Sequence, residues 1–240
     1  MRPAPFWRSR CARAHANRGI HPGVTIKGTT LVECPACGRT SPCELIQSIN
    51  TRTEPAAKHR LLLGELNTLV CDCGRRTQLA ARVLFHDPDR DFYCVVVPGG
   101  DQAQDEAERL FDAVGNTVGT QRVVPSLNAL IEKVKILDAD LADGPVEMTK
   151  VLLLASLPEP DLDRVLLFER VERPDEDGEP GVLRWLMFDV RGEEPSLLSS
   201  PLAAYERLTH SPHAQPRPGQ RRIDRAWAVE AVRAMIAGAN

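Results

Sequence analysis

Two short cysteine loops constrain this chain more than any other feature of its sequence. The first loop runs from Cys34 to Gly38 with the sequence CPACG, and the second runs from Cys71 to Gly74 with the sequence CDCG. Structural zinc sites are usually built from two such loops, which together supply four thiolate or imidazole ligands in a tetrahedron. The glycine after each pair allows a positive φ angle, so that backbone amides can point at the sulfurs. The loops therefore predict a metal site formed by Cys34, Cys37, Cys71 and Cys73.

Four thiolates would fill the coordination sphere of the ion, so we expect structural zinc (Zn2+) rather than a catalytic metal. A rubredoxin-like iron site would use the same ligands, and four reduced cysteines without a metal are the remaining alternative. Only one residue separates Cys71 from Cys73. Side chains two apart on a strand point to the same face, which would let both sulfurs reach the ion. Arginines follow both loops, and we expect a charge-balancing role beside the metal for Arg39, Arg75 and Arg76.

The chain has seven cysteines, and close pairs without an export signal favour metal binding over disulfides. We therefore expect a reducing, cytoplasmic location. Cys43 and Cys94 lie in apolar strand-like segments, and we expect both to be buried and inert, because reactive cysteines need an exposed electropositive setting. Cys43 is the nearest spare thiol if one of the four predicted ligands turns away.

Charge is distributed unevenly along the chain. Residues 1–90 hold 14 Lys and Arg against 7 Asp and Glu, whereas residues 91–240 hold 16 against 26. The basic half could bind a polyanion, or it could pair with the acidic half of its own chain. We favour the second possibility. Residues 1–22 carry five arginines and no acid. We expect a disordered basic leader or a start site assigned too early, with a nucleic-acid-contacting arm as the alternative.

No apolar run approaches the roughly 20 residues that a membrane helix needs, so we expect no membrane partner. Alternation and turn residues predict an N-terminal antiparallel sheet with strands at 24–33, 44–50, 66–70, 77–85 and 92–97. A helix beginning at residues 53–55 and ending at Gly64 is inserted between the two cysteine loops. The fold class is therefore α+β, with a zinc-ribbon-like sheet and an inserted short helix.

Helices and a β-hairpin follow this sheet. Helical spacing predicts helices at 103–114, 127–141, 146–156, 201–208 and 223–236, with Ser126 as the cap of the second. A short extended piece is expected at 121–124. Two apolar segments at 165–171 and 182–190, joined by a polar turn, predict the hairpin.

The chain resembles the bacterial CpXC domain family, which is named for a tetrad present here as Cys34 to Cys37. The segments 45–50, 64–67 and 85–88 occur in the family's order around the second cysteine pair. Segments 130–133 and 146–150 look like those that follow the domain, so the resemblance covers roughly 24–155. The second pair in the family usually has two residues between its cysteines. The resemblance implies the metal site and the fold, and it implies no particular activity.

These observations divide the chain into consecutive parts. We expect the basic leader at 1–22, the CpXC zinc-ribbon-like domain at 23–100, an α+β region packing on it at 101–210, a Pro-rich linker at 211–221 and a C-terminal helix at 222–240.

We expect a non-catalytic zinc-binding module that mediates a macromolecular interaction, with another protein as the partner. A nucleic-acid-binding transcriptional regulator is the alternative, supported by the basic half. An enzyme that uses the turn containing His86, Asp87 and Asp89 is less favoured, because a turn needs such residues for its own geometry. Helical spacing suits solvated or cross-helix ion pairs for Glu132-Lys133 and Glu147-Lys150.

Overall fold

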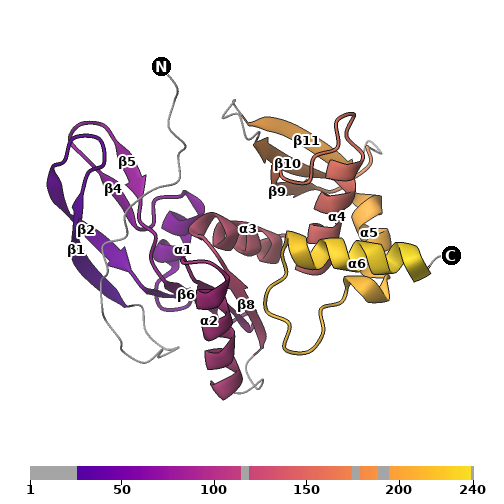
Figure 1. Ribbon diagram of the computed structural model, residues 1–240, viewed down its shortest axis with the longest axis horizontal. Coiled ribbons are helices and arrows are strands. Elements are labelled where there is room, and N and C mark those ends of the chain that lie inside the picture. The colour runs from indigo at the N-terminus through magenta and orange to yellow at the C-terminus, as the bar shows by residue number, and fades with distance from the viewer. Residues whose placement is uncertain (1–25, 115–118, 175–178, 189–194, 239–240) are drawn as a thin grey trace.

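The computed structural model describes residues 26–114, 119–174, 179–188 and 195–238, which form an α+β protein (Figure 1). Small hairpins lie at one end, a four-stranded sheet lies in the middle, and a three-stranded sheet with its helices forms the other end. The α+β class predicted from the sequence is thus confirmed. The leader predicted at residues 1–22 lies outside the described residues, as do the ends of the strands predicted at 24–33 and 182–190.

Two antiparallel hairpins carry the cysteine loops at their tips. Strand β1 (Lys27–Glu33) pairs with β2 (Thr40–Ile46), and the short β4 (Thr68–Val70) pairs with β5 (Arg76–Gln78). The buried Asn67 joins them, because its side-chain amide accepts from the backbone N–H of Ile46 (2.7 Å) and donates to the carbonyl of Ile46 (2.9 Å). Both polar ends of a buried amide are therefore satisfied, and the hairpins are fixed relative to each other.

The central sheet has the strand order β3 (Ser48–Asn50), β6 (Val83–Asp87), β7 (Phe92–Val96) and β8 (Thr120–Val124). Strands β6 and β7 are antiparallel as predicted, but β3–β6 and β7–β8 are parallel pairs. Parallel neighbours require a long crossover connection. One crossover contains helix α1 (Pro55–Leu62) and the second hairpin, and the other contains helix α2 (Asp101–Val114).

The expectation of an antiparallel N-terminal sheet is therefore wrong for the β3–β6 pair, whereas β8 was not part of the predicted sheet. The strand predicted at 44–50 is divided between β2 and β3, and the strand predicted at 77–85 is divided between β5 and β6. Each half joins a different sheet, which local alternation cannot reveal. The extended piece predicted at 121–124 is a full edge strand of the central sheet.

Side chains alternate between the two faces of the central sheet, and each face is covered by a helix. Phe85 and Val96 face helix α3 (Leu127–Asp138) in the largest apolar cluster, whereas Leu84 and Val95 pack with residues of α2. Helix α3 begins as predicted, since the hydroxyl of Ser126 accepts from the amide of Ala129 at 3.2 Å.

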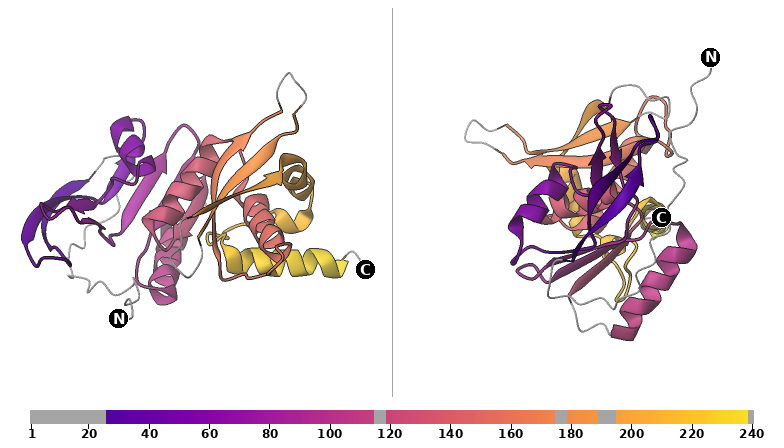
Figure 2. Two further views of the ribbon diagram at one scale, coloured as in Figure 1. Left: turned by 90° about the horizontal axis from the view of Figure 1, so that it is seen from above. Right: turned by 90° about the vertical axis from the view of Figure 1, so that its left-hand side faces the viewer.

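The second half contains helix α4 (Asp143–Ala155) and a sheet in the order β11 (Ser196–Pro201), β10 (Val182–Phe188), β9 (Val165–Glu172). The predicted hairpin is confirmed as β9 and β10, whereas the third strand, β11, was not predicted. The buried indole of Trp185 donates to the Ser200 hydroxyl at 3.0 Å, which ties β11 to this sheet. Helix α5 (Leu202–Thr209) follows β11 directly. Figure 2 shows α4 and α5 on one side of the three-stranded sheet.

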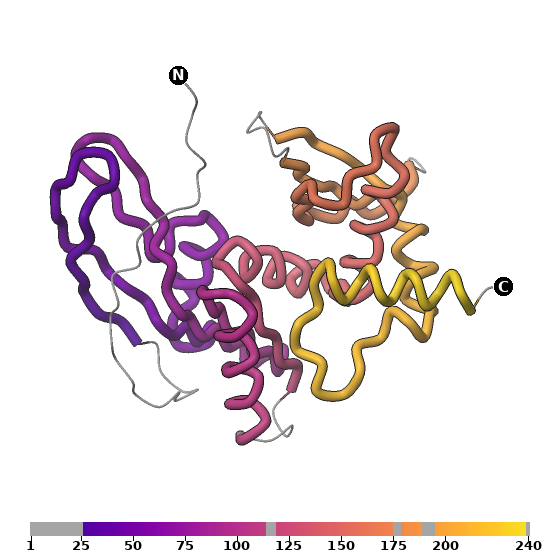
Figure 3. Tube along the Cα trace, viewed as in Figure 1, coloured from indigo at the N-terminus to yellow at the C-terminus, as the bar shows by residue number. Residues whose placement is uncertain are grey.

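The chain after α5 turns back toward the central sheet before it ends, as the tube in Figure 3 shows. A short 3-10 helix (Pro212–Ala214) buries Ala214, and the carbonyl of Arg221 accepts from the amide of Val123 in β8 (3.1 Å). Helix α6 (Arg225–Gly238) then packs against α4. The division into domains proposed from the sequence, including the linker at 211–221, stays a prediction. No helix in the described ranges combines the length and the apolar character needed to cross a lipid bilayer.

Candidate metal centre

The two cysteine loops fold into similar turns. The amide of Gly38 donates to the carbonyl of Cys34 at 2.9 Å, and the amide of Gly74 donates to the carbonyl of Cys71 at 2.8 Å. Gly38 has a φ of 71° and Gly74 a φ of 84°. The positive φ predicted for the glycine after each cysteine pair is confirmed, and it closes each turn around its thiols.

The four cysteine sulfurs converge from the tips of the two hairpins. The Sγ atoms of Cys34 and Cys73 are 3.7 Å apart, and those of Cys37 and Cys71 are 3.6 Å apart. All four sulfurs lie within 4.8 Å of one another. Sulfurs bound to one zinc at about 2.3 Å in a tetrahedron would be about 3.8 Å apart. These distances fit a shared ion and far exceed the disulfide length of about 2.05 Å.

The shortened second pair reaches the cluster through a turn and not through strand alternation. Cys71 and Cys73 follow strand β4 in a turn and do not lie on a strand. Strand alternation therefore does not apply to this pair, although both thiols converge with the first pair. The turn after β4 brings both sulfurs into the cluster.

The thiols differ in their surroundings. Cys34 and Cys71 are 1% and 3% exposed, whereas Cys37 and Cys73 are exposed to solvent. The backbone amide of Ala36 is the main cause that lowers the pKa of Cys34 to about 6. The amide of Cys73 favours the Cys71 thiolate, but burial and the neighbouring thiols leave the pKa of Cys71 raised. A metal that binds all four as thiolates would therefore release protons.

The arginines beside the loops are exposed. The guanidinium of Arg39 lies 2.6 Å from the carboxylate of Asp72, so an ion pair connects the two loops across the cluster. Arg75 and Arg76 are exposed at the start of β5. The charge-balancing role of Arg39, Arg75 and Arg76 stays a prediction.

Cys43 and Cys94 are buried, as predicted. Cys43 packs in the small cluster with Cys34, Leu69 and Cys71, and its thiol points to the carbonyl of Glu44 at 3.6 Å. Burial raises the pKa of Cys43, and it raises the pKa of Cys94 to about 12. Neither thiol joins the group of four.

The turn that contains His86, Asp87 and Asp89 makes structural contacts. The His86 ring stacks on Tyr93 with a centroid separation of 4.1 Å. The buried carboxylate of Asp87 accepts from the amide of Asp89 at 3.2 Å and lies 3.6 Å from the ammonium of Lys58. These contacts fix the turn, in agreement with the structural role favoured from the sequence.

The cross-helix ion pairs predicted for Glu132-Lys133 and Glu147-Lys150 are present, and they are buried between α3 and α4. Sequence spacing indicated that these residues could meet. It did not indicate that they would line a cavity.

Comparisons with curated proteins and with solved structures gave no match. A family model described as CpXC protein matches residues 32–150. The matched segment contains the four clustered cysteines, the central sheet, α3 and most of α4, and it ends before the three-stranded sheet. Through residues 32–150 the chain belongs to the CpXC protein family.

Proposed function

We propose that residues 26–80, here called the cysteine module, form a structural zinc site through which the protein binds another protein. The convergence of four thiols within 4.8 Å carries this proposal. Four thiolates complete a tetrahedron and leave no position for substrate or an activated water. A site of this composition holds a fold together and does not turn over a substrate.

The need for a metal follows from the size of the hairpins. Strands β4 and β5 have three residues each, and isolated two-stranded hairpins are at best marginally stable in water. The buried part of the cluster between the hairpins consists only of Cys34, Cys43, Leu69 and Cys71. An ion that joins both loops would supply the missing stability. Zinc suits this role better than iron because it has no redox chemistry.

The cysteine module offers apolar surface to a protein partner. Leu31 is 70% exposed on β1, and Val70 is 61% exposed on β4. Exposed apolar side chains of this size are typical of the centre of protein interfaces. Thiolate ligands also require a reducing compartment, and we therefore place the protein in the cytoplasm.

The charges of the module favour a protein over a nucleic acid. Arg39 pairs with Asp72, and Arg60 pairs with Glu44 at 2.6 Å. Lys58 lies 2.6 Å from Asp138. These cations are partly neutralised within the chain, which weakens the contacts with phosphates on which nucleic-acid binding depends.

Elemental analysis of the purified chain tests the metal. We expect one zinc per chain and a colourless protein, whereas a ferric site with four thiolates would be coloured. A chain that binds no metal after purification under reducing conditions and titration with zinc would refute the site.

Site-specific photo-crosslinking in the native host tests the partner. A photoreactive residue at Leu31 should give a discrete adduct that protease destroys and nuclease leaves intact. The same residue at Leu110, exposed on α2, is the matched control and should give none. A nuclease-sensitive adduct at Leu31 that weakens steeply with salt would favour the nucleic-acid alternative. Equal labelling from both positions would contradict the proposed interface.

A further inference from the structure

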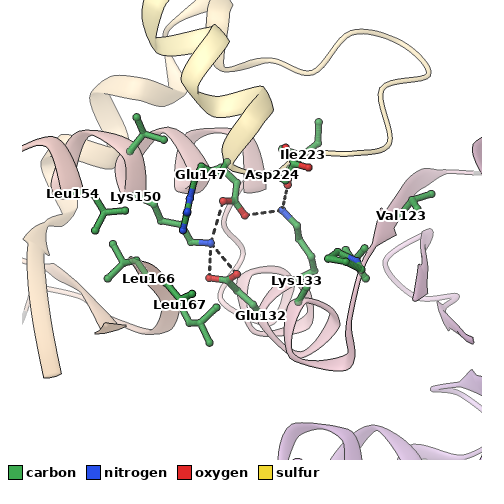
Figure 4. Close-up of a pocket in the computed structure, with 16 residues that line it drawn as sticks. Val123, Glu132, Lys133, Glu147, Lys150, Leu154, Leu166, Leu167, Ile223 and Asp224 are labelled. Carbon is green, nitrogen blue, oxygen red and sulfur yellow. Dashed lines mark hydrogen bonds and ion pairs between the residues drawn. The ribbon is translucent and has the colours of Figure 1, made fainter. Parts of the chain in front are cut away.

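A cavity of about 200 Å³ lies between α3, α4, β9 and the segment 223–225 (Figure 4). In Figure 1, α4 and β9 lie at the opposite end of the molecule from the cysteine hairpins. Most of its wall is aliphatic, and Leu154, Leu166 and Leu167 lie together on one side of it. At about 30 Å³ per molecule of liquid water, this volume suits a small ligand of a few heavy atoms. Mostly apolar cavities with a few convergent polar groups are typical of small-molecule sites.

The polar part of the cavity is a ladder of alternating charges from two helices. Glu132 and Lys133 come from α3, and Glu147 and Lys150 come from α4. No member of this ladder is more than 8% exposed. Buried ion pairs contribute little net stability compared with well-packed apolar residues. Their presence in a cavity wall therefore favours a binding role.

Each ammonium group of the ladder is fully occupied. The Nζ of Lys150 lies 2.8 Å from both carboxylate oxygens of Glu132 and 3.0 Å from Oε2 of Glu147. The Nζ of Lys133 lies 3.0 Å from Oε1 of Glu147, 2.7 Å from the carbonyl of Ile223 and 3.2 Å from Asp143. An ammonium has three N–H groups, so neither lysine has a donor left for a ligand.

The carboxylates, in contrast, have acceptor capacity left. A carboxylate offers about four lone-pair positions. Glu132 accepts from Lys150 through both oxygens and from the amide of Phe168 at 2.5 Å, whereas Glu147 accepts from one lysine on each oxygen. Among the described residues, one position on Glu132 and two on Glu147 therefore stay open. The cavity needs a ligand that donates hydrogen bonds.

We propose that this cavity binds a small aliphatic amine as its ammonium ion, with the alkyl group against the leucines and the ammonium against Glu132 and Glu147. This site lies apart from the cysteine module and does not depend on a metal there. Asp224 also lines the cavity, but it is an exposed residue whose carboxylate accepts from the amide of Trp227 at 3.0 Å. The only other charged group there is Arg225, whose guanidinium donates to the carbonyl of Arg164 at 2.5 Å.

The electrostatics of Glu132 agree with a cationic guest. Burial is the main cause that raises the pKa of this carboxyl, and Glu147 raises it further against the opposing effect of Lys150. A second positive donor beside it would stabilise the ionised form. An anionic ligand would instead have to displace a carboxylate from a lysine.

Binding of three probes with the same body size tests the proposal. Isobutylammonium chloride, 2-methylpropan-1-ol and sodium isobutyrate would be titrated into the full-length chain and followed by ligand-observed NMR. We expect isobutylammonium to bind at least tenfold more tightly than the alcohol, and isobutyrate not to bind. Equal binding of the amine and the alcohol, or preferred binding of isobutyrate, would overturn the proposal.

A cavity-filling variant localises the binding. Ala129 lines the cavity without taking part in the ion pairs, so Ala129→Leu should fill it and weaken isobutylammonium binding at least tenfold. The matched control is Ala226→Leu, at an exposed position outside the cavity, which should bind as the wild type does. Thermal unfolding would establish that both variants are folded. If a folded Ala129→Leu chain binds isobutylammonium unchanged, the cavity is not the site.

Discussion

At the scale of single residues, two groups of side chains form the candidate sites, and they differ in whether their charges are balanced within the chain. The thiols of Cys34, Cys37, Cys71 and Cys73 lie within 4.8 Å of one another. Four thiolates would repel one another without a cation. The buried ladder of Glu132, Lys133, Glu147 and Lys150 is balanced within the chain, and its lysines have no donor left.

The substitution Cys71→Ser should remove the metal. A serine hydroxyl is a poor zinc ligand and the remaining three thiolates leave the tetrahedron open, so we expect zinc content to fall from about one per chain to well below half. Elemental analysis after gel filtration would measure this. Cys43→Ala is the control, because Cys43 lies in the same buried cluster but outside the group of four. Equal metal loss in both variants would contradict the assignment of ligands.

Asp143 should make stability depend on pH. Burial opposes its ionisation, but the positive charges of Lys133 and Arg122 outweigh burial and hold its pKa well below the usual range. A carboxyl with a lowered folded-state pKa stabilises the fold fully above its unfolded pKa of about 3.9, and this contribution is lost as pH falls further. Asp143→Asn should therefore cost about 3 kcal/mol at pH 7. The difference from the wild type should shrink at pH 3.

Urea denaturation of both chains at pH 7 and pH 3 would measure this effect. Asp163→Asn, at an exposed position, is the control and should change the free energy of unfolding little at either pH. A loss for Asp143→Asn that is the same at pH 7 and pH 3 would show that its charge is not responsible.

At the scale of elements, the hairpin tips decide where the thiols lie. Each cysteine loop is the turn of a hairpin, and a glycine with a positive φ closes it. Strands β4 and β5, which flank the second cysteine loop, are only three residues long. The geometry of the turn between them therefore orients Cys71 and Cys73. Asn67 then fixes this hairpin to the first through Ile46.

Gly74→Ala should weaken both the module and its metal. Nothing lies within 4 Å of the position that a Cβ would take at Gly74, so the cost comes from the φ of 84° alone and should be about 1–2 kcal/mol. Gly28→Ala on β1 is a matched control, with equally open surroundings and no left-handed backbone. Competition with a chromophoric chelator should show weaker zinc affinity only for Gly74→Ala, and equal affinity in both variants would refute the role of the turn.

At the scale of the whole molecule, the apolar clusters are unequal. The large cluster around Phe85 lies on the central sheet, and the large cluster around Trp185 lies on the three-stranded sheet. The cluster beside the cysteine loops is small. We therefore expect the central sheet and the three-stranded sheet to keep their packing without an ion. We expect the hairpins β1–β2 and β4–β5 to need one, because they bury little apolar surface of their own.

Removal of the metal should unfold the cysteine hairpins locally. Hydrogen exchange after treatment with a chelator should show faster exchange at residues 27–46 and 68–78, with little change in β9 and β10. Re-addition of zinc should restore protection. Loss of protection throughout the chain would instead mean that the metal supports the global fold, and no change anywhere would mean that the hairpins do not need it.

Local patterns in the sequence were sufficient for much of the fold. Helical spacing predicted α1, α2 and α3, the cap at Ser126 marked the start of α3, and the polar turn between apolar runs predicted the β9–β10 hairpin. The pairing partners of β3, β8 and β11 were not predicted. The neighbours of a strand depend on contacts between residues that are distant in sequence. The local sequence of a short extended segment does not determine these contacts. Strand β11 was also not predicted because its serines interrupt the alternating apolar pattern that indicates a strand.

The sequence by itself determined the ligand types, the two loops and the glycines that close them, because these depend on residue identity and short spacing. Only the tertiary structure decided that the four sulfurs meet at distances suited to one ion, since the two loops are brought together by the pairing of separate hairpins and by Asn67. It also decided that four charged residues with ordinary helical spacing are buried beside an aliphatic cavity. The burial of these residues depends on the segments that pack against α3 and α4. These segments are β9 and residues 223–225, which lie far from α3 in the sequence, so local patterns do not predict the contact.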